Sequence, residues 1–296
     1  MNSRGIKMTK GTANGGRLAM SKQAKLDEIG PWSELKLEII RKYAKAYSTI
    51  LARQQHPSLK HIYIDGFSGP GQHISKGSGE MIPGSPLNAL EVTPPFAEYF
   101  LIDLDGTKVA HLETLVGERA DVHILQGDCN ELLLERVFPR IRFEDYRRGL
   151  CLLDPYGLHL DWRVLSEAAR MRSIEIFLNF PILDINRNVL RHDPGKVALQ
   201  DRDRMTRFWG DEGWAEELYE PSQQLSLFGD PDSEKKSNEA VAKVFRSRLR
   251  KVAGFAHVPL PVPMRNSKGS ELYYLFFAAQ KPVAASIVED IFRDYR

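Results

Sequence analysis

Short apolar runs alternate with longer segments of helical periodicity along most of the chain. Apolar runs bounded by turn residues predict strands at 61–65, 100–103, 122–125, 150–153 and 174–180. Apolar positions that recur every three or four residues predict helices at 32–51, 160–171, 238–252 and 282–295. Two further alternating runs, 257–263 and 272–278, predict a hairpin around the turn at 266–270.

This alternation predicts an α/β fold with a doubly wound, mostly parallel seven-stranded sheet and a C-terminal antiparallel hairpin. Residues 1–30 are basic, rich in Gly and Ser and without apolar periodicity, so we expect a flexible arm. Residues 31–296 then form the folded domain, which a long polar insertion at 185–237 interrupts. The insertion is expected to be either a lid over the functional site or a peripheral helical addition.

Composition says little about the partners or the cellular location of the protein. The 296 residues carry a net charge of +2, which does not point to any one partner. The two cysteines, Cys129 and Cys151, lie far apart beside predicted strands, which favours buried thiols in a reducing, cytoplasmic environment over a disulfide or a metal site. No apolar run is long enough to predict a membrane span.

The first predicted strand runs directly into a glycine-rich turn. The glycines at 66, 69 and 71 have the spacing G-x-x-G-x-G, which differs from the G-x-G-x-x-G of nicotinamide enzymes, and no Gly-Lys-Ser/Thr follows to complete a phosphate loop. Asp65 and Phe67 complete a pattern that resembles motif I of S-adenosylmethionine (SAM) dependent methyltransferases. We therefore predict a Rossmann-like methyltransferase fold in which Asp65, Phe67, Gly69 and Gly71 bind SAM.

Acidic residues also end the second, third and fourth predicted strands. Asp103 is placed to accept the ribose hydroxyls of SAM, and Asp128 to accept its adenine amino group. Ser85 is predicted to cap a helix whose N-terminus faces the glycine turn and favours the carboxylate of SAM. Each Asp taken alone also fits the commoner role of a helix N-cap.

The fourth strand ends in Asp154-Pro155-Tyr156-Gly157. This sequence resembles the Asp-Pro-Pro-Tyr motif of methyltransferases that act on the amino groups of bases, although it has a single proline, and Asp-Pro-aromatic-Gly also resembles transfer-RNA guanine-N2 methyltransferases. Asp154 and the Pro155 carbonyl are expected to accept hydrogen bonds from the target amine, and Tyr156 to stack on the base. The sequence does not decide whether the target base is adenine, cytosine or guanine, or whether it belongs to DNA or RNA.

Several of these segments together resemble the three-Cys-motif partner (TcmP) family of methyltransferase-like proteins. The resembling residues span most of 32–280 and are Trp32-Ser33, Lys36-Leu37, Ile40, Lys42-Tyr43, Tyr63-Ile64-Asp65, Phe67, Gly69, Gly71, Gly84-Ser85-Pro86, Asp154-Pro155-Tyr156-Gly157, Asn186-Arg187 and Tyr273-Tyr274-Leu275. The resemblance implies a protein partner with clustered cysteines and leaves the substrate undefined. Two functions compete: a SAM-dependent nucleobase amino-methyltransferase, and a catalytically silent methyltransferase fold that acts as a binding module with the cysteine-motif partner.

A pentapeptide within the insertion points to a second partner. The segment Gln224-Leu225-Ser226-Leu227-Phe228 resembles the peptide by which bacterial polymerases and repair proteins dock on the DNA sliding clamp. In that mode Gln224 contacts the pocket rim, while Leu225, Leu227 and Phe228 supply the apolar anchors. The alternative is that Leu227 and Phe228 pack on the domain. Clamp binding would favour DNA over RNA as the substrate.

Overall fold

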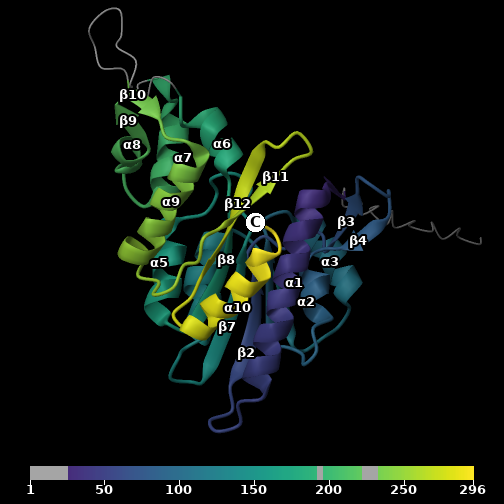
Figure 1. Cartoon of the computed structure of the whole chain (residues 1–296). Coiled ribbons are helices and arrows are strands. Elements are labelled where there is room, and N and C mark those ends of the chain that lie inside the picture. The colour runs from purple at the N-terminus through teal and green to yellow at the C-terminus, as the bar shows by residue number, and fades with distance from the viewer. Residues whose placement is uncertain (1–25, 192–195, 222–232) are drawn as a thin grey trace, which may run out of the picture.

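The computed structural model describes residues 26–191, 196–221 and 233–296, and its centre is a seven-stranded sheet (Figure 1). The strand order is β11-β12-β8-β7-β2-β5-β6, in which β12 runs antiparallel to both of its neighbours and the other pairs are parallel. The strands are β2 (Lys60–Asp65), β5 (Glu98–Asp103), β6 (Val122–Gln126), β7 (Arg147–Leu153), β8 (Ile174–Phe180), β11 (Val262–Arg265) and β12 (Glu271–Ala278). This topology confirms the predicted doubly wound sheet and its antiparallel hairpin, which together form a Rossmann-like methyltransferase fold.

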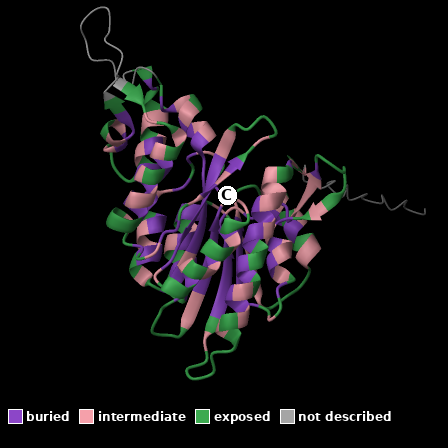
Figure 2. Cartoon of the chain, viewed as in Figure 1, coloured by how far each residue is buried: buried purple, intermediate pink, exposed green. Residues whose placement is uncertain are grey.

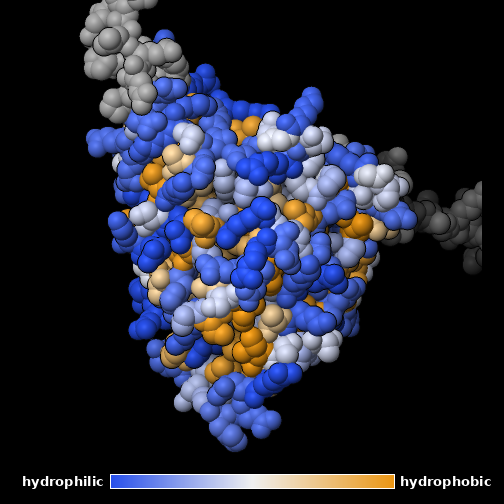
Figure 3. All heavy atoms as spheres, viewed as in Figure 1, coloured by the Kyte–Doolittle hydropathy of each residue, from blue (hydrophilic) through white to orange (hydrophobic). Residues whose placement is uncertain are grey.

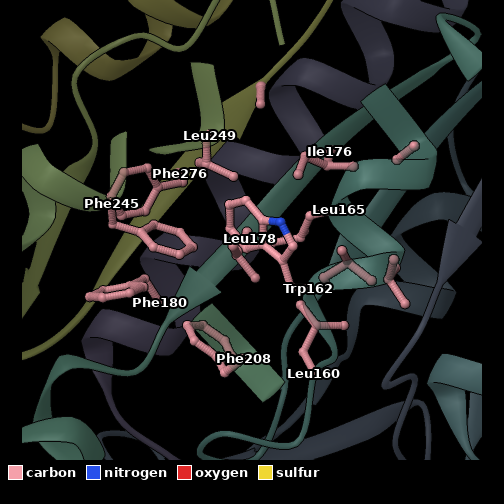
Figure 4. Close-up of a cluster of buried hydrophobic side chains, with 14 of the residues drawn as sticks. Leu160, Trp162, Leu165, Ile176, Leu178, Phe180, Phe208, Phe245, Leu249 and Phe276 are labelled. Atoms are coloured by element: carbon pink, nitrogen blue, oxygen red, sulfur yellow. The ribbon is translucent and has the colours of Figure 1, made fainter. Parts of the chain in front are cut away.

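Helices cover both faces of the sheet, which is why the central strands are buried on both sides (Figure 2). The helices on one face are α1 (Pro31–Ala52), α2 (Ser85–Leu90), α3 (Gly106–Val116) and α10 (Pro282–Arg293). The other face carries α4 (Cys129–Leu132), η1 (Leu133–Val137), η2 (Phe138–Arg140), α5 (Trp162–Met171), α9 (Asn238–Arg248) and η4 (Leu249–Ala253). Aromatic side chains fill much of this second core, where Phe245 lies against Phe180 and Phe276 (Figure 4).

A small second sheet flanks the glycine-rich turn. Its strands are β1 (Glu28–Ile29), β3 (Gln72–Ser75) and β4 (Met81–Pro83), in the order β1-β3-β4. Residues 26–30 were expected to belong to the flexible arm. That expectation is wrong for Glu28 and Ile29, because backbone pairing of Glu28 with Ile74 and of Ile29 with Ser75 holds them in this sheet. Residues 1–25 of the predicted arm lie outside the described residues.

The N-caps of two helices lie before Ser33 and Ser85, the serines that the sequence suggests as caps. The N-cap of α1 is Gly30, whose carbonyl oxygen accepts from the amides of Ser33 at 2.9 Å and Glu34 at 3.2 Å. The N-cap of α2 is Gly84, so Ser85 is its first helical residue. In both helices a proline occupies the first turn, where its fixed φ is favourable and its missing N–H costs nothing.

The described part of the insertion packs against the main domain. It contains α6 (Ile182–Asn188), α7 (Leu199–Trp209), α8 (Trp214–Glu217), β9 (Tyr219–Pro221) and β10 (Ser233–Lys235). Arg248 of α9 anchors it: this buried guanidinium donates to the Trp209 carbonyl at 2.8 Å and to Glu217 at 3.0 Å, and it also pairs with Asp211. The predicted clamp-binding residues 224–228 lie outside the described residues.

Candidate active site

A cleft of about 820 Å³ lies at the carboxyl ends of the parallel strands. Its walls are the loops that follow β2, β5, β6, β7 and β8, together with residues of α1, α6 and β12. The chain leaves β2 toward β5 and β6 and then returns to β7 on the other side, so the strand order reverses between β2 and β7. Ligands of open α/β sheets bind at such a reversal point, outside the carboxyl ends of the strands.

The glycine turn has one position open to the cleft and one closed by packing. Gly69 has φ +62°, and a Cβ placed there would meet no atom within 4 Å. Gly71 has φ +82°, but a Cβ there would lie 2.6 Å from Leu112 Cδ1 of α3. Gly69 therefore lines the cleft and lets a ligand approach the backbone, whereas Gly71 is needed for close packing of the turn and does not line it.

Asp65 supports the glycine turn from below. Its side chain is buried and Oδ1 accepts the Phe67 amide at 3.2 Å, while Phe67 itself lines the cleft. Burial raises the pKa of Asp65 to about 7, although hydrogen bonds from Ser85 and the Phe67 amide oppose the rise. Asp65, Gly71 and Ser85, all predicted as SAM contacts, do not line this cleft, and their contacts with SAM stay predictions.

Asp103 and Asp128 both line the cleft, on the side of β5 and β6. Asp103 Oδ2 accepts the Gly69 amide at 2.8 Å, and Oδ1 accepts the Asp105 amide at 2.9 Å. Each oxygen retains a lone pair, so Asp103 can still accept a ligand hydroxyl. Asp128 is the N-cap of α4, because Oδ1 accepts the Asn130 amide at 2.7 Å. The commoner capping role thus holds for Asp128, whose carboxylate is nevertheless exposed to the cleft.

Asp154 forms an ion pair with Lys36 across the cleft, from the end of β7 to the first turns of α1. Lys36 is buried, and its ammonium lies 5.3 Å from the centre of the Tyr273 ring. Burial lowers the pKa of Lys36, but the Asp154 carboxylate outweighs that effect and the net pKa is raised, so Lys36 is charged at neutral pH. Lys36 is a buried lysine on the apolar face of α1, and its partner lies 118 residues away in sequence.

The residues after Asp154 present an aromatic ring to solvent. Pro155 is buried, whereas Tyr156 is 90% exposed and stands at the cleft. Gly157 has φ +62°, and a Cβ there would lie 3.0 Å from Asp184 Oδ2. The turn therefore requires glycine, and it directs the Tyr156 ring outward, where an incoming planar group can stack on it.

Two polar residues on the β8 side were not predicted as site residues. Asn179 is the penultimate residue of β8 and Asp184 lies in α6, and both line the cleft. Asn179 Oδ1 and Asp184 Oδ2 are buried and accept no hydrogen bond in the described structure. Asn179 could have been found by the same strand-end reasoning that found Asp103, whereas Asp184 carries no sequence signal of its own. With Asp154 they make this end of the cleft rich in acceptors.

The cysteines and the described helices narrow the chemistry further. Cys129 and Cys151 are free and buried, as predicted, and burial raises the pKa of both thiols, which makes them poor nucleophiles. Within the described ranges, no three His, Cys, Asp or Glu side chains are grouped so that they hold a metal ion. None of the helices described is both long and apolar enough to cross a membrane.

Comparison by sequence identifies no family. No family model matches the chain, and no curated protein matches it either. The resemblance to the TcmP family therefore rests on the residues quoted above, and membership is not confirmed.

Comparison with solved structures finds methyltransferases and a protein of the DUF519 family. A Legionella pneumophila protein of the DUF519 family is 12% identical, with 88% of this chain and 92% of that one covered at a TM-score of 0.45. The N-methyltransferase NodS of Bradyrhizobium japonicum, in complex with S-adenosylhomocysteine (SAH), is 7% identical, with 85% and 89% covered at 0.39. The plantazolicin methyltransferase BamL, also with SAH, is 8% identical, with 84% and 88% covered at 0.35. These likenesses are distant, and the class of fold follows from the strand order itself.

Proposed function

We propose that this protein is a SAM-dependent methyltransferase that acts on an exocyclic amino group of a nucleobase. The observation that carries the proposal is the position of Asp154-Pro155-Tyr156 in the same cleft as the glycine turn, at the reversal point of a methyltransferase sheet. A cleft of about 820 Å³ falls within the usual range of cofactor and ligand sites, roughly 300–1,000 Å³.

The β2, β5 and β6 side of the cleft fits SAM. Gly69 lets a ligand approach the backbone, Asp103 has lone pairs for ribose hydroxyls, and the exposed Asp128 carboxylate is available to an adenine amino group. When bound, SAM supplies a methyl group activated by its positively charged sulfur. These residues fit SAM because the two carboxylates can accept hydrogen bonds from its ribose hydroxyls and its adenine amino group, and because Gly69 leaves room for the ligand beside the backbone.

The β7 and β8 side fits an amine. Asn179 Oδ1 and Asp184 Oδ2 are buried acceptors without a donor in the described structure, and the second oxygen of Asp154 is a further acceptor. An exocyclic NH₂ group brings two donors. Acceptors that bond the amine hydrogens return electron density to a nitrogen whose lone pair is otherwise delocalised into the ring. Tyr156 stacks on the base and orients that nitrogen, which a base in a duplex reaches only after it is flipped out.

Lys36 orients Asp154 for this role. The ammonium holds one carboxylate oxygen, Oδ2, and the other oxygen remains available to the target amine. Because the ion pair is built into the buried end of α1, the carboxylate needs little reorganisation when substrate arrives.

The same ion pair favours the rival function, a silent methyltransferase fold that binds a cysteine-motif partner. An Asp154 that is permanently occupied by Lys36 would have no free role toward an amine. The two functions differ in whether a methyl group is transferred, so they are separable by experiment.

The substrate polymer and partners extend the proposal. DNA is favoured over RNA because of the clamp-like pentapeptide at 224–228, which lies outside the described residues. Arg187 at the cleft, which is exposed, is suited to contact a phosphate of either polymer.

The test is transfer of a labelled methyl group from SAM to separate pools of DNA and RNA. Wild-type protein should label DNA, and Asp154→Ala should abolish labelling while SAH still binds. Asp161→Ala serves as the matched control, because Asp161 is an acid at the N-terminus of α5 that makes no cap hydrogen bond and lies outside the cleft wall. Binding of SAH without labelling of either pool would favour the silent module.

A further inference from the structure

A second cavity, of about 220 Å³, opens near the amino ends of β7 and β8, at the opposite end of the strands from the cleft. It lies between the C-terminal end of α1, the N-terminal end of α10 and the starts of β7 and β8. Figure 3 shows hydrophobic atoms gathered between the lower ends of α1 and α10 in the same region. Ile50 and Val283 line it and are 44% and 56% exposed.

The floor of this cavity holds polar groups that lack partners. Tyr47 is only 6% exposed, and its hydroxyl is buried without a hydrogen bond in the described structure. Glu175 beside it accepts the Tyr43 hydroxyl at 2.6 Å through Oε2, and no described residue donates to Oε1. Burial raises the pKa of Glu175 to about 7, in keeping with a carboxyl group that has no cation against it. A buried hydroxyl without a partner is costly, so a ligand that bonds it gains affinity.

The entrance of the cavity is lined by basic residues. Arg148, Arg172 and Lys281 line it, and none of the three forms an ion pair with an acid in the described ranges. Arg148 lies 3.7 Å from the centre of the Phe143 ring and donates only to backbone carbonyls, and Lys281 lies 5.7 Å from the same ring. Three cations without acidic partners around an apolar opening favour an anionic group at the entrance.

We propose that this cavity binds a small planar aromatic acid whose ring carries an N–H donor. The ring fills the apolar walls, its N–H donates to the Tyr47 hydroxyl, and its carboxylate lies against the cations at the entrance. A cavity of about 150 Å³ already accepts benzene, so 220 Å³ has room for two fused rings. The inference is independent of methyl transfer, since this site shares no residue with the cleft.

Indole-3-acetate is the probe, titrated into the full-length protein by calorimetry. We expect a Kd on the order of 100 µM, as the ligand efficiency of small ligands allows. 1-Naphthylacetate keeps the carboxylate but lacks the N–H, and indole-3-acetamide keeps the N–H but lacks the charge. Each should bind about five- to tenfold more weakly, the usual effect of one lost buried hydrogen bond or one charge contact.

Protein variants locate the bound probe. Tyr47→Phe should fold normally, because it removes a hydroxyl that has no partner, and should weaken indole-3-acetate about five- to tenfold. Arg172→Ala with Lys281→Ala should weaken indole-3-acetate but not indole-3-acetamide, and Lys45→Ala on the solvent face of α1 should change neither. Saturating SAH should leave binding unchanged. Absence of binding at millimolar probe, equal affinity for 1-naphthylacetate, or displacement by SAH would each overturn the proposal.

Discussion

Substitutions of Lys36 and Asp154 should have strongly non-additive effects on the free energy of unfolding, because the two side chains form an ion pair. The Lys36 side chain is 9% exposed and that of Asp154 is 30% exposed. Removal of one partner of a fully buried pair costs about 3–5 kcal/mol, because the other charge is left buried and unpaired. Asp154→Asn strands the better-buried ammonium, so we expect a loss of about 2–3 kcal/mol. Lys36→Met strands a carboxylate that reaches water, so we expect about 1–2 kcal/mol.

The double variant then loses less than the sum of the two single variants. Neither charge is left stranded in it, so the coupling energy should be about 1–2 kcal/mol, obtained from urea denaturation of all four proteins at neutral pH. Glu239 and Lys243, an exposed pair at 2.7 Å on α9, provide the matched control cycle, for which we expect a coupling several-fold smaller. Additivity within about 0.5 kcal/mol for Lys36 and Asp154 would refute the description of this pair as a buried, preorganised unit.

Three further predictions concern other parts of the chain. Tyr156→Ala should lower methyl transfer at least tenfold without changing stability, because the ring is 90% exposed, and a loss of stability in denaturation would contradict this. Burial raises the pKa of Glu175 from 4.5 to about 7. The contribution of this group to stability is therefore fully present below about pH 4.5 and is lost progressively as the pH rises to about 7. Glu175→Gln should therefore gain up to about 3 kcal/mol over wild type between pH 4.5 and 8, and a difference constant with pH would rule this out. Leu227→Ala with Phe228→Ala should abolish retention on immobilised sliding clamp, at a cost of about 2–4 kcal/mol in binding, and equal retention would remove the clamp prediction.

The sheet could be predicted from the sequence because its strands are short, apolar and separated by helical periodicity. The small sheet of β1, β3 and β4 could not, because its strands are short and partly polar, and because β1 pairs with residues of β3 that are far away in sequence. The helix caps were misplaced for a related reason. Gly30 and Gly84 cap through their backbone conformation, which leaves no side-chain signal, whereas Ser33 and Ser85 offered a familiar one.

The site could be predicted to the level of the strand ends but not to the direction of each side chain. Asp65, Asp103 and Asp154 all end strands, yet Asp65 is buried beneath the turn and the other two line the cleft. Whether an acidic residue at a strand end lines the cleft or is buried beneath the turn depends on tertiary packing, which the local sequence pattern does not encode. The partner of Asp154 was hidden for the same reason, since Lys36 is brought to it only by the docking of α1 on the sheet.

Calorimetric titration of SAH into the purified protein tests the central claim, that the cleft at the strand ends is a SAM site. We predict binding to the wild type, binding to Asp103→Ala that is weaker by about 1–3 kcal/mol, and unchanged binding to the Asp161→Ala control. Asp103 is the informative position because its Oδ2 holds the glycine turn through the Gly69 amide while its carboxylate lines the cleft. Failure of SAH to bind the wild type at millimolar concentration, or equal affinity for wild type and Asp103→Ala, would contradict the claim.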